Sequence, residues 1–146
     1  MTRSAAMSTP QRSTRRLRLV LRANAAFSLI GGLIAVTAGP WVSEQLGIDH
    51  VAITRLLGAG LIVFAGDVAF VSRRIEPKLR RETAYVSAAD FGWVLATIVV
   101  LATGALNPTG VVVASAIGVV AADFGIAQLW LRRTAVTPQA TATLAV

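Results

Sequence analysis

Asp67, Asp90 and Asp123 each lie inside a long apolar stretch of the sequence. A carboxylate can bind a proton or a cation, and it costs about 2.5–3.5 kcal/mol at the centre of a membrane helix. Such residues usually face protein or water and often mark the path of an ion. If all three face one interior, their mutual repulsion would keep at least one protonated at neutral pH. These aspartates are therefore the first candidates for a functional site.

Smaller polar side chains accompany the aspartates. Asn24 and Ser28 lie four residues apart, and Ser87 lies three residues before Asp90, so each pair shares one face of a helix. We expect a candidate intramembrane polar site made of Asp67, Asp90, Asp123, Asn24, Ser28 and Ser87. One hypothesis is that this site handles protons or cations. The other, which we favour, is that these residues form hydrogen bonds between helices, each contributing about 0.6 kcal/mol on average.

A basic partner for these carboxylates must come from the ends of the apolar stretches. Arg74 lies seven residues after Asp67 on the same helix face. Its side chain would tilt towards the N-terminus of its helix, and thus towards Asp67. Arg74 is therefore a candidate partner for Asp67.

Other catalytic chemistry has few residues available. The chain contains no cysteine and a single histidine, His50. Cysteine nucleophiles, thiolate metal sites and disulfides are thereby excluded. We expect no catalytic, metal or cofactor site, and we do not expect an enzyme.

The apolar stretches themselves predict membrane-spanning helices. Of the 146 residues, 55% are hydrophobic and 14% are charged, whereas ordinary soluble domains contain roughly 25% charged residues. A span needs about 20 mainly apolar residues, and backbone groups in lipid must bond within a helix. The predicted fold is all-α, a four-transmembrane-helix bundle with spans at about 23–42, 55–72, 83–106 and 111–131. Residues 17–133 form this domain, and 1–16 and 134–146 are expected to be disordered tails.

The positions of the charges predict how the spans are oriented. Thirteen of the fourteen basic residues precede the first span, connect the second to the third, or follow the fourth. Basic residues accumulate on the cytoplasmic side of membrane proteins, so both termini are expected in the cytoplasm. This placement also explains the net charge of +7 without nucleic acid. We expect the first span to be retained and not cleaved as a signal peptide, because its apolar run is long.

A short motif occurs twice. Ala88-Ala89-Asp90-Phe91-Gly92 in the third span recurs as Ala121-Ala122-Asp123-Phe124-Gly125 in the fourth. Either an internal duplication or chance in a chain rich in alanine and glycine explains the match. Two duplicated halves of two spans each would keep the same orientation in the membrane. The third and fourth spans run in opposite directions, so the motif that they share cannot come from a duplication of this kind.

Three segments carry a resemblance to a known group. They are Arg22-Ala-Asn24-Ala-Ala-Phe27-Ser28 with Gly31-Gly32, then Arg55-Leu-Leu-Gly58, then Ala89-Asp90-Phe91-Gly92-Trp93-Val94-Leu95. Together they resemble small four-helix bacterial integral membrane proteins that are similar to the DoxX-like class. The resemblance covers about residues 17 to 133. It implies the fold and a bacterial cell (inner) membrane location, with Asn24 and Asp90 as characteristic positions, and it implies no reaction.

The sequence therefore supports two hypotheses about function. The first is a structural or accessory helical bundle whose partners are the lipid bilayer and a second copy or another membrane protein. The alternative is a small oligomeric transporter coupled to protons or cations, in which Asp67, Asp90 and Asp123 bind the ion or substrate.

Overall fold

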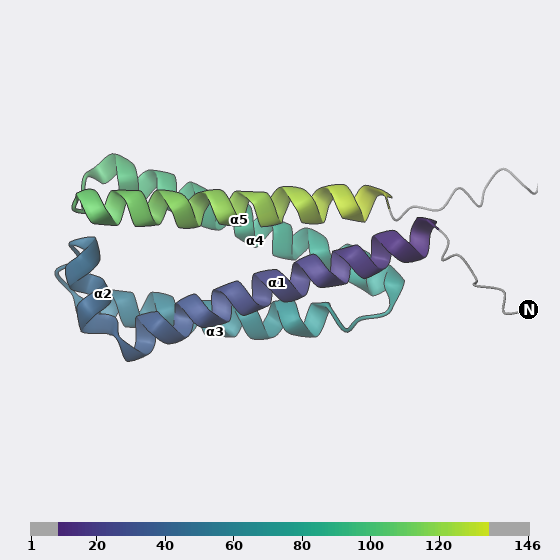
Figure 1. Ribbon diagram of the computed structural model, residues 1–146, viewed down its shortest axis with the longest axis horizontal. Helices are drawn as coiled ribbons and strands as arrows, with labels where there is room; N and C mark the ends of the chain where they lie inside the picture. Colours follow the sequence, from purple (N-terminus) through teal and green to yellow (C-terminus); the bar gives the residue numbers. More distant parts are fainter. Residues whose placement is uncertain (1–8, 135–146) are drawn as a thin grey trace, which may run out of the picture.

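The computed structural model describes residues 9–134, which form five helices and no strand. Four of the helices are long and apolar enough to cross a membrane. The prediction of an all-α fold with four long apolar helices is therefore confirmed. The helices, shown in Figure 1, are α1 (Thr9–Thr37), α2 (Gly39–Leu46), α3 (Val51–Val71), α4 (Glu76–Thr103) and α5 (Pro108–Thr134).

The first predicted span differs from the structure at both of its ends. Helix α1 begins at Thr9, so residues 9–16, expected to be a disordered tail, are helical. Pro10 suits the first turn of a helix, and the arginines that follow it are good helix formers. At the other end α1 stops at Thr37, and residues 39–46 form the separate helix α2. If α1 continued, the ring of Pro40 would clash with the carbonyl group of Val36, four residues earlier. The remaining parts of the expected tails, 1–8 and 135–146, lie outside the described residues.

The long helices pack as two pairs. Helix α3 lies along α1, helix α4 lies along α5, and α1 packs against α5 to join the pairs. Helices α3 and α4 make few contacts with each other. Figure 1 shows the two pairs close together at the end where α1 begins and further apart towards α2. We call the end where the long helices of the two pairs converge the basic end, because the arginines of the start of α1, the α3–α4 connection and the end of α5 lie there. At the other end the short helix α2 contacts α5.

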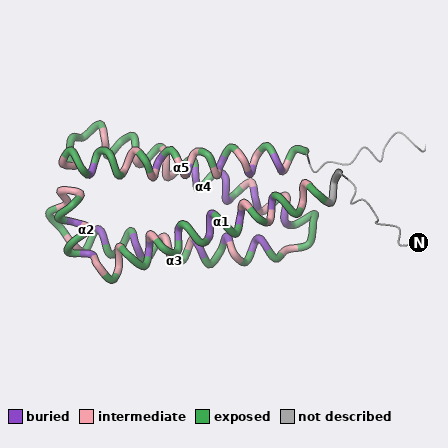
Figure 2. Tube along the Cα trace, in the orientation of Figure 1, coloured by how far each residue is buried: buried purple, intermediate pink, exposed green. Residues whose placement is uncertain are grey.

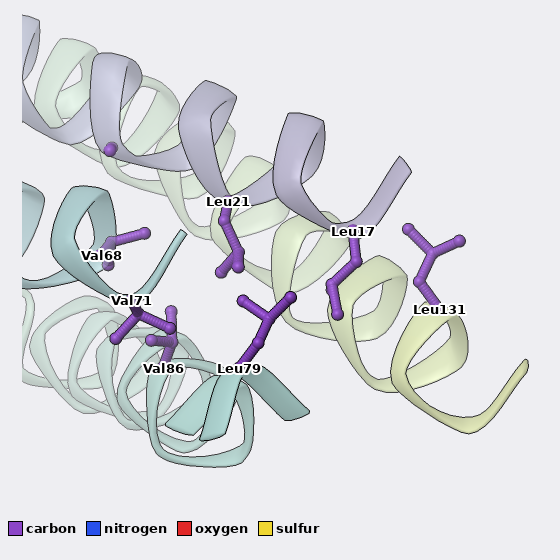
Figure 3. Packing of buried hydrophobic residues seen from close by; sticks show 8 residues of the cluster. Leu17, Leu21, Val68, Val71, Leu79, Val86 and Leu131 are labelled. Atoms are coloured by element: carbon purple, nitrogen blue, oxygen red, sulfur yellow. The ribbon is translucent and has the colours of Figure 1, made fainter. Parts of the chain in front are cut away.

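The hydrophobic core lies at the basic end. Side chains from all four long helices meet there, as Figure 3 shows for Leu17, Leu21, Val68, Val71, Leu79, Val86 and Leu131. In α4 every buried residue falls between Leu79 and Asp90, so residues 91–103 contain none. Figure 2 shows exposed residues along all the long helices, and many are large and apolar, such as Val63 at 74% exposure. A surface of this kind needs lipid or another protein to cover it.

Arg18 fixes α1 to the end of α3. Its guanidinium group donates hydrogen bonds to the carbonyl oxygens of Ser72 and Arg74, both at 2.7 Å. Both residues follow Val71, the last residue of α3, and the C-terminal end of a helix attracts positive charge. Arg18 therefore binds the start of the α3–α4 connection to α1 and places a favourable charge near the end of α3.

At the opposite end α2 connects the two helix pairs. The backbone N–H of Asn107 donates a hydrogen bond to the carbonyl oxygen of Leu46 at 3.2 Å. The Asn107 side-chain oxygen accepts from the Gly110 amide at 2.7 Å and so caps the start of α5. A Cβ atom on Gly110 would lie against the Leu46 carbonyl. The end of α2 can therefore reach α5 only because residue 110 is glycine.

Helices α1 and α3 approach closely where Gly32 faces Gly58. A Cβ atom on Gly32 would lie 2.7 Å from the carbonyl oxygen of Gly58 and 2.9 Å from Cγ1 of Ile62. The neighbouring Gly31 has open space around it. The close approach of α1 to α3 therefore requires glycine at position 32 but not at position 31.

Replacing Gly32 by alanine should separate α1 from α3, because the new methyl group meets backbone atoms. We expect the Gly32→Ala variant to lose about 1–3 kcal/mol of unfolding free energy, the usual range for overpacking. The measurement is unfolding of the detergent-solubilised protein in a titration with SDS. Gly31→Ala is the matched control and should lose no stability, since alanine favours a helix more than glycine does. Equal stability of the two variants would contradict the close approach.

Candidate functional site

Asp90 lies in the interior of the bundle with 4% of its surface exposed. Its carboxylate accepts hydrogen bonds from the side-chain amide of Asn24, at 3.1 Å to Oδ1 and 2.9 Å to Oδ2. The side-chain amide of Gln128 donates a further hydrogen bond to Oδ2 at 3.0 Å. One carboxylate therefore joins α1, α4 and α5.

Two serines extend these contacts. The Ser28 hydroxyl donates to the side-chain oxygen of Asn24 at 3.4 Å. The Ser87 hydroxyl lies 3.1 Å from the side-chain oxygen of Gln128 and 3.0 Å from the backbone oxygen of Thr83, and its single proton can serve one of them at a time. All five side chains are buried. We call Asp90, Asn24, Gln128, Ser28 and Ser87 the Asp90 network.

Helical periodicity explains why these side chains point inward. On α1, Leu17, Leu21, Asn24 and Ser28 are buried at steps of three or four residues, which places them on one face. On α5, Gly118, Ala121, Gly125 and Gln128 are buried at the same steps. A Cβ atom on Gly125 would lie 3.5 Å from Cβ of Asp90. The tighter contact would be with the ring of Phe91, 3.1 Å from Cζ, so glycine at residue 125 leaves room for this side chain of α4.

The other two aspartates lie outside the bundle. Asp67 on α3 and Asp123 on α5 are both exposed. The inner face of α3 is occupied by Ala65, Val68 and Val71, and one residue is about 100° of helix rotation, so Asp67 points away from Val68. The three carboxylates therefore do not meet in one interior cluster. Of the six predicted site residues, the structure brings together Asn24, Ser28, Ser87 and Asp90.

Arg74 does not pair with Asp67. Its Nε atom forms an ion pair with Oε2 of Glu82 at 3.2 Å, and its guanidinium group lies 4.0 Å from the centre of the Phe70 ring. The prediction from sequence is wrong because the α3–α4 connection brings Glu82 within reach of Arg74. Within residues 9–134 this is the only ion pair.

The repeated motif has opposite environments in its two copies. Asp90 is buried and hydrogen-bonded, whereas Asp123 at the equivalent position is exposed. Gly92 has open space around it, whereas Gly125 contacts the ring of Phe91. The two copies therefore turn opposite faces inward: Asp90 is the buried residue of the copy in α4, whereas Ala121 and Gly125 are the buried residues of the copy in α5.

Gln128 is the residue of this network that sequence reasoning missed. It is the only glutamine inside the four predicted spans, and it lies three residues after Gly125 and seven after Ala121. A buried amide usually has a hydrogen-bond partner. Gln128 shares a helix face with Ala121 and Gly125. A polar residue on a face of small residues in an apolar helix could therefore have indicated a contact between helices.

The arrangement is suited to packing more than to binding. The carboxylate of Asp90 is already occupied by donors from two other helices. Within the described part of the chain, no group of three or more acidic or histidine side chains is placed to hold a metal ion. No model of a protein family, no curated protein and no solved structure matches the chain.

Replacing Asp90 by alanine should lower stability, because the Asn24 and Gln128 amides lose their acceptor inside the bundle. We expect a loss of about 1–3 kcal/mol for the unsatisfied donors, measured in an SDS titration followed by tryptophan fluorescence. Asp90→Asn keeps one acceptor oxygen and should lose less.

The matched control comes from the second copy of the motif. Asp123 is exposed, so Asp123→Ala should stay within about 0.5 kcal/mol of the parent, as surface changes usually do. If Asp90→Ala proves as stable as Asp123→Ala, the Asp90 network does not hold the helices together.

Proposed function

We propose that this chain is a multi-pass membrane protein of the bacterial inner membrane, with both termini in the cytoplasm. Four long apolar helices support the membrane location. The orientation is supported by the thirteen basic residues that precede, connect or follow the spans on one side, against Arg55 alone on the other. The bacterial assignment rests on the resemblance to small four-helix proteins of bacteria.

Within the membrane we propose a structural or accessory role for the bundle. The observation that carries this proposal is the enclosure of the Asp90 carboxylate by amides from α1 and α5. A site for a moving ion needs a carboxylate that is accessible or shared with others. Asp67 and Asp123 lie on outer faces of the bundle, so the geometry favours packing over transport.

The exposed aspartates also support association with another chain. Asp67 shares an exposed face of α3 with Gly60, Val63, Gly66 and Phe70. The two glycines have open space where a side chain would be, which lets another helix approach closely. A carboxylate facing lipid is unfavourable, whereas a partner helix can hydrogen-bond it. We propose that a second copy covers this face, with another membrane protein as the alternative partner.

The orientation can be tested with single cysteines, because the natural chain has none. Asp49→Cys lies between α2 and α3, and Lys78→Cys lies near the start of α4; both positions are exposed. A maleimide that cannot cross membranes should label Cys at position 49 in intact spheroplasts. It should label position 78 only after the membrane is permeabilised. The reverse pattern would contradict the proposed orientation.

Self-association can be tested by placing a bulky side chain beside Asp67. In Gly66→Leu a bulky side chain occupies the face where a second copy would approach, so the oligomer seen by native mass spectrometry in mild detergent should dissociate. Gly92→Leu is the control, because Gly92 is also exposed and open but lies on α4. It should leave the oligomer intact. A parent protein that is strictly monomeric and has no partner after crosslinking in membranes would contradict the proposal.

A further inference from the structure

A shallow hollow at the basic end is lined almost entirely by arginine. Its lining residues are Pro77, Arg80, Arg81 and Arg132, and its volume is about 340 Å³. Arg80 and Arg81 belong to the first turns of α4, and Arg132 belongs to the last turn of α5. Three guanidinium groups from two antiparallel helices are therefore held around one space.

Two acidic side chains at the basic end, Glu76 and Glu82, bind residues outside the hollow. Glu82 pairs with Arg74, and Glu76 accepts a hydrogen bond from the Thr14 hydroxyl. None of the three arginines of the hollow forms an ion pair within the described residues. The Nε atom of Arg80 is buried and has no hydrogen-bond partner among those residues. The hollow thus has excess positive charge.

From these observations we propose that the hollow binds the phosphate group of an anionic phospholipid. Guanidinium groups present several donors in a planar fork that matches the oxygens of phosphate. A lipid is the favoured source because of the position of the hollow. Trp130, two residues before Arg132, is 60% exposed, and exposed tryptophans concentrate at the headgroup level of a membrane.

This inference rests on the proposed membrane location, and the test is designed to separate the two. The reporter is Trp130 in the full-length chain carrying Trp41→Phe and Trp93→Phe. The protein is reconstituted in vesicles that contain phosphatidylglycerol or phosphatidylcholine brominated on the acyl chains. Bromine quenches a tryptophan that it contacts. Quenching by either lipid reports that Trp130 lies in the bilayer. An excess with phosphatidylglycerol reports that the anionic lipid gathers around the end of α5, and the arginine variants below test whether the hollow causes it.

We expect brominated phosphatidylglycerol to quench Trp130 at lower lipid fractions than brominated phosphatidylcholine. A basic residue near an anionic membrane contributes roughly fivefold in affinity. Arg80→Gln combined with Arg132→Gln should therefore weaken the selective quenching by about 25-fold. The control combines Arg15→Gln with Arg16→Gln, which removes the same charge from α1 and none from this hollow, and it should weaken the selective quenching less than the Arg80 and Arg132 pair does. Arg81 is exposed, and Arg81→Gln alone should weaken the selective quenching about fivefold. This single variant replaces the double variant in the test if the double variant does not fold.

Three results would overturn the inference. Equal quenching by the two lipids would show that the hollow does not select an anion, although Trp130 lies in the bilayer. An equal loss in the α1 control would show that general surface charge is responsible. Reversal of the selective quenching by millimolar inorganic phosphate would show that the site takes free phosphate and not a lipid. Absence of quenching by both lipids would instead contradict the membrane location itself.

Discussion

The carboxylate of Asp90 connects α1, α4 and α5, because Asn24 donates to both of its oxygens and Gln128 donates to one of them. Lipid chains are as apolar as leucine, so burial of apolar surface drives helix association weakly in a membrane. Polar contacts and close packing must then choose which helices become neighbours. The Asp90 network supplies such a choice where α1 meets the α4–α5 pair. Gly32 facing Gly58 makes the corresponding choice between α1 and α3.

The rest of the architecture follows from where these contacts lie. The hydrophobic core and the Arg18 cap occupy the basic end. Beyond Asp90 no residue of α4 is buried, and at the far end α2 alone links the two pairs through Asn107 and Gly110. Large apolar side chains are exposed along the rest of the bundle.

The sequence predicted four long apolar helices, because long apolar stretches and flanking arginines are visible in it, but it did not predict that α1 begins as early as Thr9. The break at Pro40 was also within reach, since proline cannot continue a helix. The rotation of each helix was harder to predict. Asp90 and Asp123 occupy the same motif, yet only Asp90 is buried. Which face turns inward depends on packing partners such as Gly125 and Val68 from other parts of the chain. Such long-range contacts leave no local pattern around the aspartate itself.

Carbodiimide modification can test the enclosure of Asp90. A carbodiimide activates carboxyl groups that it can reach, and peptide mass spectrometry identifies the modified residue. In a detergent that keeps the chain folded and monomeric, we expect modification of Asp67 and Asp123. Asp90 should react only after unfolding in SDS. Modification of Asp90 in the folded protein at the rate of the two exposed aspartates would contradict the account.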